Sequence, residues 1–448
     1  MRKVTLLALT LLSLNAYSQE HFSGIATSKR VGILNGHTNP SEFANLNSKF
    51  EVQLFTLSLN VSNNKVGFKD LTKGDDLESL IFDGKGNVDF EMNTAILGPS
   101  FAMRHKKWGF GISSKAFIKA SIIDLDTDLG NALINDEIND VTGITNIFSK
   151  DNQRVNATTW GEIGFSVARS VYQTDKHRVN AGVTLKLLFP GSYANIGLNN
   201  FTGTITNNLT DLRLTDANST MNIAYSGNFG SSFSDSSDYF QSFFGSLNGM
   251  ATDIGVDYQW LKDDKTYKLK VGASVRNMGS MTFSGDENVS EQYALNIPNG
   301  DPGLNLNEFE DVEGLEDVET VLNNHPEYFT STSSSEEFKV KLPTVFNLYA
   351  DYKVLSKVSV TVFLQQKMGD QNSNNQVSTQ NMFTVTPRVT LGAFEAFLPI
   401  GNNEISGGTL GLGFRVGGFF LGSNSILSAV TSDSNQADAY FGFRFGFL

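Results

Sequence analysis

The feature that most constrains this chain is an alternation of apolar with small or polar residues along most of its length. The C-terminal stretch AYFGFRFGFL carries its aromatic series on one parity, at Phe441, Phe443, Phe445 and Phe447. Successive side chains of a strand point to opposite faces of a sheet, so this stretch predicts a strand with one apolar face. The same two-residue period appears in WGFGISSKAFIK (108–119), RVNAGVTLKLLF (178–189) and YKLKVGASVRN (267–277).

Segments of about ten residues with this alternation are typical of transmembrane β-barrel strands, although a soluble sandwich alternates too. The connections separate the two alternatives. Short turns, such as 105–107 and 174–177, alternate with long polar stretches at roughly 63–86, 123–156, 190–250 and 279–337. Outer-membrane barrels have short turns at one end and long loops at the other. A sandwich has the same solvent at both ends and gives no reason for this asymmetry.

We therefore expect an all-β fold: a transmembrane antiparallel β-barrel of about 14 strands with long extracellular loops. Closure removes the sheet edges, which is obligatory where no water can satisfy exposed backbone groups. The expected strands are 50–61, 87–104, 108–122, 158–172, 178–189, 251–260, 266–278, 339–352, 357–367, 380–388, 392–399, 406–416, 419–428 and 437–448. The region 380–399 also fits one long strand.

The start of the chain predicts export. Residues 1–18 read as a signal peptide, with Arg2 and Lys3 before an apolar run and Ala16-Tyr17-Ser18 as the cleavage site. The apolar run is too short to span a bilayer as a helix. The expected division is a signal peptide at 1–18, an N-terminal plug-like segment at 19–48 and an outer-membrane β-barrel at 49–448. The expected location is the cell outer membrane.

Composition excludes several other functions. The chain contains no cysteine, so disulfides and thiolate metal sites are excluded. Its formal net charge of -13 argues against nucleic acid as a partner. Neither an HExxH metal motif nor a GxSxG nucleophile motif occurs, and the five histidines have no metal-ligand spacing. We expect no catalytic residues, no metal, no cofactor and no enzymatic activity.

The plug-like segment contains HTNPSEFANLNS. Asn39 fits the N-cap of a short helix, Pro40 its first position, and Glu42 lies three residues after the cap, followed by Phe43. We expect a compact turn and helix outside the strand ladder. It would plug the barrel from the periplasmic end or rest beneath the barrel, and these residues do not choose between the two.

The inner parity of the expected strands collects polar and charged side chains. They would line an aqueous path or, as the alternative, form a mixed-sign network that fills and stiffens the barrel. The expected lumen-facing polar residues are Lys115, Lys119, Glu162, Lys186, Lys270, Arg276, Asp351, Glu395, Arg415 and Arg444. Trp108 and Trp260 lie beside short turns, as an interfacial aromatic girdle requires.

Two acidic stretches lie in the long connections. DLDTDLG (124–130) resembles the start of a calcium loop, but the later ligand positions fail, so a solvated acidic loop is favoured. The stretch 307–329 places Leu315, Val318 and Leu322 at helical spacing. It predicts an amphipathic helix packed over the barrel mouth, with a partner-binding helix as the alternative.

Several stretches together resemble a Bacteroidetes-type family of outer-membrane barrels of unknown function, which is distantly similar to the long-chain fatty acid transporter (FadL-like) barrels. They are SKRVGILNGHTNPSEFANLN, GVTLKLL, DIGVDYQW, VGASVRNMGS, LPTVFNLYADY, GFRVGGFFLGSNSIL and YFGFRFGF, over residues 22–448. The resemblance implies fourteen strands, a hatch inside the lumen, and passive uptake by lateral release into the membrane. Asn39 and Pro40 match an NPA-type motif near that hatch, but Ser41 replaces its alanine. No ligand-binding residue is transferred.

The expected function is passive uptake of small hydrophobic or amphipathic molecules through an outer-membrane barrel. The alternative is a structural or docking component of surface secretion or gliding machinery, since the loops are longer than a simple pore needs. Expected partners are outer-membrane lipid, a hydrophobic small-molecule ligand and the barrel-assembly machinery. That machinery would read the C-terminal strand with Phe441, Phe443, Phe445 and Phe447.

Overall fold

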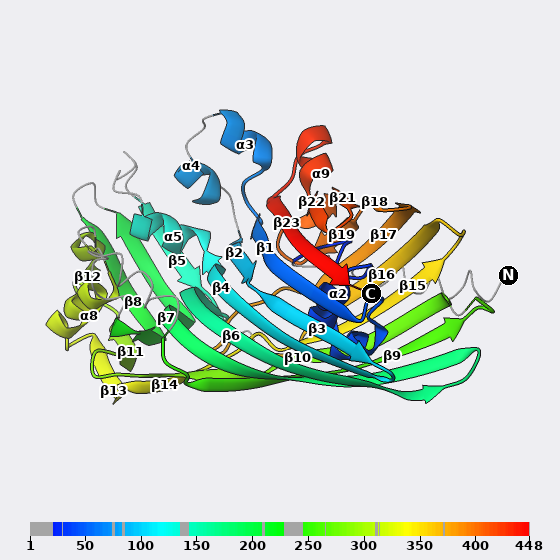
Figure 1. The fold of residues 1–448 in the computed structure, drawn as a ribbon. Coiled ribbons are helices and arrows are strands. Elements are labelled where there is room, and N and C mark those ends of the chain that lie inside the picture. Colours follow the sequence, from blue (N-terminus) through cyan, green and yellow to red (C-terminus); the bar gives the residue numbers. More distant parts are fainter. Residues whose placement is uncertain are drawn as a thin grey trace.

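The first and last strands pair with each other, so the sheet closes into a ring. This is seen in the computed structural model, which describes residues 21–28, 30–73, 77–82, 86–134, 143–207, 211–227, 245–264, 266–309, 312, 314–370 and 372–447. β1 (Phe50–Asn63) pairs antiparallel with β23 (Gln436–Phe447), placing Leu57 opposite Phe441. All pairings between named strands are antiparallel (Figure 1). The fold class expected from the sequence is confirmed.

The wall has 14 strand positions within the described residues, the number expected. After β1 they are, in order around the ring, β2 (Asn87–Leu97) with β3 (Ser100–His105), β4 (Trp108–Asp126), β6 (Asn152–Gln173), β7 (His177–Asn207), β9 (Gly249–Leu261), β10 (Tyr267–Ser284), β14 (Glu337–Lys341) with β15 (Val345–Lys353), β16 (Val358–Lys367), β17 (Met382–Leu391), β18 (Phe394–Phe397) with β19 (Ile400–Asn403), β20 (Gly407–Leu410) with β21 (Leu412–Val416), β22 (Phe419–Ser423) and β23.

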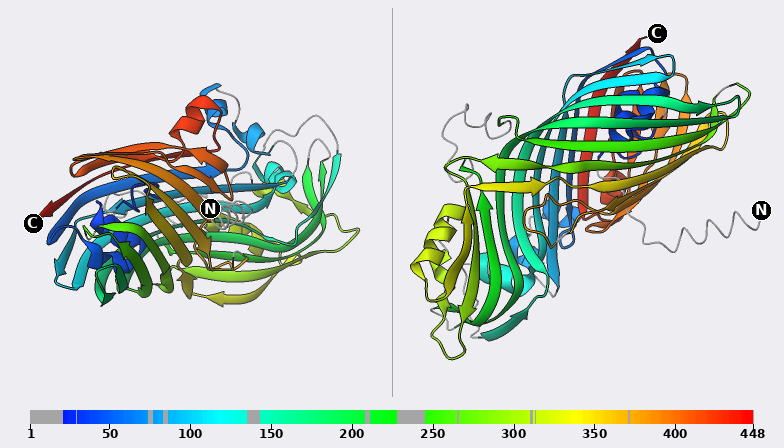
Figure 2. Two further views of the ribbon diagram at one scale, coloured as in Figure 1. Left: turned by 90° about the vertical axis from the view of Figure 1, so that its right-hand side faces the viewer. Right: turned by 90° about the horizontal axis from the view of Figure 1, so that it is seen from below.

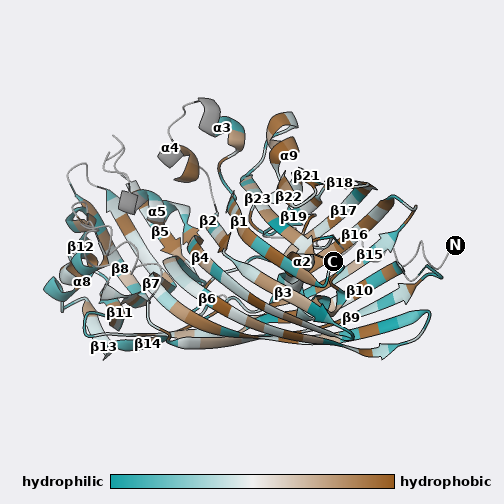
Figure 3. Cartoon of the chain, in the orientation of Figure 1, coloured by the Kyte–Doolittle hydropathy of each residue, from teal (hydrophilic) through white to brown (hydrophobic). Residues whose placement is uncertain are grey.

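The outside of the ring is apolar, as the alternation predicts. In β23, Phe443, Phe445 and Phe447 are 39%, 45% and 54% exposed, whereas Tyr440 is 1% exposed and faces the interior. Trp108 and Trp260 are also exposed on the outside, beside short turns. Figure 3 shows hydrophobic bands alternating with hydrophilic ones along the strands. A closed sheet with an apolar exterior satisfies its backbone hydrogen bonds internally and presents its side chains to lipid.

The long connections differ from their expectation as polar loops. β7 leaves β9 after Leu187 and continues beside β8, where Ala194 pairs with Tyr225. The resulting extracellular sheet adds β5 (Gly143–Phe148), β8 (Leu212–Tyr225), β11 (Val289–Ile297), β12 (Leu304–Asn305) and β13 (Phe329–Ser335). Figure 2 shows this sheet projecting from one side of the ring. Largely polar stretches, such as TGTITN in β7, therefore form strands here.

The extracellular sheet has a hydrophobic core of its own, covered by short helices. Within the described residues, the long connections contain the helices α3 (Phe68–Lys73), α4 (Leu77–Phe82), α5 (Thr127–Ile134), η2 (Leu306–Phe309) and α8 (Leu315–Asn324). All of these except α3 contribute side chains to this core. In α8, Val318 and Leu322 are buried against this core, as the helical spacing predicts. α8 packs on β8 of this sheet rather than over the barrel mouth.

Two further expectations need correction. The stretch 124–130 is not a solvated loop, because the Asp126 carboxylate accepts the backbone N–H groups of Asp128 and Leu129 at 3.0 and 3.2 Å and thereby caps α5. The expected strand 419–428 ends at Ser423, and α9 (Ile426–Thr431) follows it. No helix among the described residues is both long and apolar enough to cross a membrane.

Candidate functional site

The N-terminal segment lies inside the ring. Residues 22–46, here called the hatch, contain α2 (Gly32–Thr38) and η1 (Pro40–Asn45). The apolar side chains of the hatch, including Ile25, Val31 and Leu34, are at most 7% exposed. Figure 2 shows the dark-blue hatch enclosed by the strands. Of the two placements left open by the sequence, the structure has the one within the barrel.

The NPSEF stretch forms the turn of the hatch. The Asn39 side chain accepts the backbone N–H of Ser41 at 3.0 Å, and Pro40 occupies the first helical position. The other end of the Asn39 amide donates to the carbonyl oxygen of Val256 on β9 at 2.9 Å. Asn39 therefore caps η1 and ties it to the wall at once, which explains the need for an amide rather than a hydroxyl at this position.

Glycines of the wall make room for the hatch. A Cβ at Gly182 would lie 2.5 Å from the carbonyl carbon of Pro40, and one at Gly111 would lie 2.6 Å from the Phe43 ring. Gly109 and Gly255 approach the hatch in the same way. These glycines occupy inward positions of β4, β7 and β9. Their lack of a side chain lets backbone pack on backbone at Gly109 and Gly182 and makes room for side chains of the hatch at Gly111 and Gly255.

Buried polar contacts also hold the hatch. The Lys270 ammonium lies 2.8 Å from the Glu42 carboxylate, with both side chains at most 3% exposed. The Tyr349 hydroxyl donates to the same carboxylate. Asn45 donates to Asp257 at 3.0 Å. The predicted plug residues Asn39, Pro40, Glu42 and Phe43 thus all lie against the wall, and Lys270 is brought to Glu42.

A second charged cluster lies above the hatch. Lys115 pairs with Glu162 at 2.8 Å, and Lys186 lies 3.5 Å from Glu162 and 2.8 Å from Asp253. Lys119 lies 3.7 Å from Glu91. These side chains are all nearly buried, and the pairing offsets the cost of removing each charge from water.

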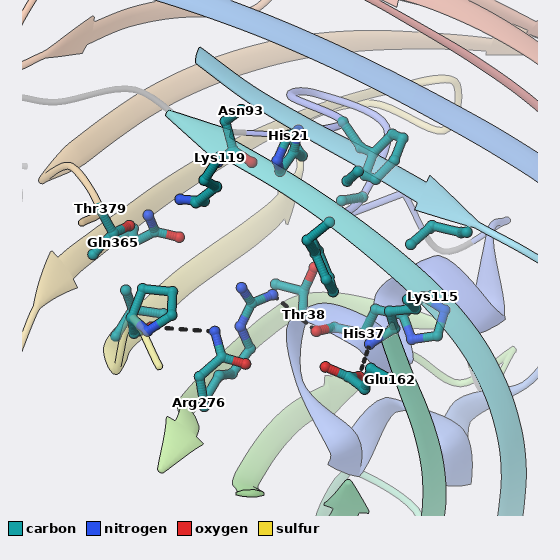
Figure 4. A pocket seen from close by; sticks show the side chains of 18 of the residues that line it. His21, His37, Thr38, Asn93, Lys115, Lys119, Glu162, Arg276, Gln365 and Thr379 are labelled. Carbon is teal, nitrogen blue, oxygen red and sulfur yellow. Dashed lines mark hydrogen bonds and ion pairs between the residues drawn. The ribbon is translucent and has the colours of Figure 1, made fainter. Parts of the chain in front are cut away.

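A cavity of about 90 Å³ opens between the hatch and this cluster and is here called the lumen cavity. Its polar wall includes Lys115, Lys119, Glu162 and Arg276 (Figure 4). Its apolar wall includes Phe117 and Trp160, whose rings stack with centroids 4.7 Å apart, together with Leu97 and Phe363. The cavity is therefore amphipathic, with cationic groups and aromatic surface side by side.

The barrel wall is irregular next to the lumen cavity. Gly98 and Pro99 separate β2 from β3. β1 pairs with β2 as far as Leu97, which lies opposite Thr56, and with β3 from Ser100, which lies opposite Gln53. A hollow of about 300 Å³ lies here, lined by Ile96, Gly98, Ser114, Lys115, Ala116, Glu162, Ile163 and Phe189. Lys115 and Glu162 line both this wall hollow and the lumen cavity.

The remaining predicted residues lie where parity places them. Arg415 and Arg444 face the interior, and Arg444 pairs with Glu51 at 2.9 Å. Asp351 and Glu395 flank the buried Arg388, which the sequence reasoning did not single out. It also missed Glu91, Asp253, Trp160 and Asp257, although all four have the inward parity of their strands. In the part of the chain that the structure describes, no three His, Asp or Glu side chains form a group that could hold a metal.

Comparisons with known proteins gave one family match and several distant structural matches. The profile of a family of unknown function, DUF5723, matches residues 43–424. No curated protein matches the sequence. Among solved structures, a TodX deltaS2S3 mutant monoaromatic hydrocarbon channel has 10% identity, covers 97% of this chain and 100% of its own, and gives a TM-score of 0.49.

Two further solved structures are similar in the same distant way. The Pseudomonas putida toluene transporter TodX has 9% identity, covers 92% of this chain and 93% of its own, and gives a TM-score of 0.42. A Pseudomonas aeruginosa FadL homologue has 10% identity, covers 96% and 98%, and gives a TM-score of 0.32.

Proposed function

The chain belongs to DUF5723, a family of unknown function, and on that premise we propose that it is an outer-membrane barrel for passive uptake of small hydrophobic or amphipathic molecules. The proposal rests on the chain's own geometry. It includes export by a signal peptide at 1–18, an N-terminal plug-like segment at 19–48 and a barrel at 49–448. The protein acts without catalysis.

One observation carries the proposal. The lumen cavity and the wall hollow share Lys115 and Glu162 in their linings, so this pair of side chains borders both the interior space and the hollow in the wall. Most of the other residues around the wall hollow are apolar, such as Ile96, Ile163 and Phe189. A molecule that moves the Lys115–Glu162 pair aside would pass from a polar interior to a surface that matches lipid tails.

The hatch favours exit sideways through the wall. Its backbone packs directly on the wall at Gly182, and buried contacts such as Lys270–Glu42 hold it in place. A polar solute that entered from outside would meet the hatch. An apolar solute would gain free energy by leaving sideways into the bilayer, at about 25 cal/mol for each Å² of apolar surface removed from water.

Uptake by cells tests the proposal. A strain without the protein should accumulate a small hydrophobic compound such as toluene more slowly, and the wild-type chain should restore the rate. Ala116→Phe would fill the wall hollow and abolish the restoration. Ala120→Phe is the matched control, since it lies on the same strand and face but outside the hollow. Normal accumulation in the deletion strain would refute the proposal.

Docking at the cell surface is the second candidate function, and the extracellular sheet favours it. β5 lies at an edge of that sheet, and its Ile144 and Phe148 are 71% and 68% exposed. Apolar side chains on an edge strand invite pairing with another protein. Pull-down after mild crosslinking should yield a stable partner with the wild type but not with Phe148→Ser. Absence of a partner would count against this function.

A further inference from the structure

Arg276 is unusual among the cations of the lumen cavity. Lys115, Lys119 and Lys186 each have a carboxylate within 4.0 Å. Among the residues described, Arg276 has no such partner, and its Nη1 donates to the carbonyl oxygen of His37 at 2.9 Å. Figure 4 shows the Arg276 side chain directed into the space between the hatch and the charged cluster. The guanidinium thus has a carbonyl oxygen rather than a carboxylate in direct contact.

Other polar groups around the same cavity also lack hydrogen-bond partners. These are Nε of Arg276, Nε2 of His37, the indole Nε1 of Trp160 and both amide atoms of Asn93. Trp160 is 3% exposed and Asn93 is completely buried. Arg276 Nε, the Trp160 indole N–H and the Asn93 amide N–H are donors, and buried donors without acceptors destabilise a protein. A molecule with acceptor oxygens in this cavity would satisfy such donors.

The rest of the cavity indicates the shape of that molecule. The Phe117–Trp160 stack, Leu97 and Phe363 provide an apolar surface. The volume of about 90 Å³ is smaller than the roughly 150 Å³ of an engineered cavity that holds benzene, so it has no room for a lipid-length acyl chain. The cavity therefore suits a small molecule with one acidic and one apolar part.

We propose that the lumen cavity binds a small monoanionic amphiphile, with its carboxylate on Arg276 and its apolar part against Phe117 and Trp160. The planar guanidinium fork matches a carboxylate with two parallel hydrogen bonds. This inference rests on the proposed function and names the substrate class of the same site.

Tryptophan fluorescence of the purified full-length barrel tests the inference. The chain has three tryptophans, so the double variant Trp108→Phe, Trp260→Phe leaves Trp160 in the cavity as the single reporter. The probes are propionate and butyrate, each compared with its neutral amide, and oleate as a long-chain acid. We expect the two small acids to change the Trp160 emission and the amides to bind at least tenfold more weakly.

Variants of Arg276 distinguish the effect of its charge on binding from a general effect on the structure. Arg276→Gln should weaken the binding of the acids tenfold or more and leave the amides unchanged, because a charge-assisted hydrogen bond is lost. Arg276→Lys should restore part of the affinity. Lys357→Gln, which removes an exposed lysine from a short turn, should change nothing. Gel electrophoresis of each variant with and without prior heating checks that the variant is folded.

Several outcomes would overturn the inference. Equal binding of acids and amides, unchanged binding in Arg276→Gln, or binding of oleate alone would each contradict it. If no probe binds but cells still take up toluene through the protein, the inference fails and the proposed function stands. If uptake is also absent, the proposed function fails as well.

Discussion

A single methyl group added at Gly182 should loosen the hatch without damaging the barrel. A Cβ at this position would lie 2.5 Å from the Pro40 carbonyl carbon and 2.6 Å from the Ser41 nitrogen. Real Cβ atoms essentially never approach closer than 3.0 Å, so Gly182→Ala requires a displacement of at least about 0.5 Å. The atoms in contact belong to backbone and cannot rotate away.

The size of the effect follows from the cost of overpacking. Inserting a methyl group into a packed contact typically costs about 1–3 kcal/mol. Alanine fits the strand conformation of β7. We therefore expect the added methyl group to destabilise the hatch in its position against the wall rather than the strand itself. The ratio of seated to displaced hatch should then fall roughly 5- to 150-fold, at about 1.4 kcal/mol for each factor of ten.

Conductance across a planar bilayer measures this ratio. The wild type should stay closed to ions, and Gly182→Ala should show frequent openings. Gly408→Ala is the matched control, because nothing lies within 4 Å of a Cβ at that position. If Gly182→Ala stays closed as often as Gly408→Ala, the hatch is not seated on the glycines of the wall.

Three other changes should have distinct effects. Lys270→Met leaves the buried Glu42 carboxylate unpaired, which costs about 3–5 kcal/mol, so added protease should cleave the hatch region faster than in the wild type. Phe443→Arg places a charge on the lipid face and should lower the free energy of folding into vesicles by up to about 2–4 kcal/mol. A loss smaller than the one caused by Phe443→Ala would contradict the outward placement of this side chain. The hydrogen bond to Glu308 raises the pKa of His325 in the extracellular connection, so this contact stabilises the connection below pH 6.5 and is lost as pH rises through the folded-state pKa. Hydrogen exchange of residues 314–329, corrected for the intrinsic rate, should therefore increase with pH in the wild type and stay flat in His325→Gln.

The ring could be predicted from sequence because its cause is local. In β4, Trp108 and Phe110 point outward and Lys115 inward simply because successive side chains alternate, and no distant partner is needed to read this. The polar strands of the extracellular sheet were missed for the opposite reason. β8 is held by β11, more than sixty residues away, with Tyr225 opposite Val289, and its polar residues resemble a loop until that partner is known.

The hatch is an intermediate case. Its turn could be predicted, since Asn39 caps η1 by a contact within two residues. Its location inside the ring was implied by the family resemblance but could not be derived from its own residues, because the seat is composed of glycines from separate strands, such as Gly111, Gly182 and Gly255. Each looks like an ordinary small residue on the inner face, and only closure of the ring brings them to one helix.

The most direct test of the account is to lock the hatch and measure uptake. Ala44 of the hatch and Ala168 of β6 belong to one buried cluster, and the chain has no native cysteine. Ala44→Cys with Ala168→Cys therefore introduces two thiols and no others, and formation of the disulfide between them is checked by thiol labelling before uptake is measured. If molecules leave sideways through the wall hollow, uptake of toluene should be the same before and after reduction of this disulfide. Uptake that is lost in the oxidised protein and returns on reduction would show that the hatch must leave, and would contradict the lateral route.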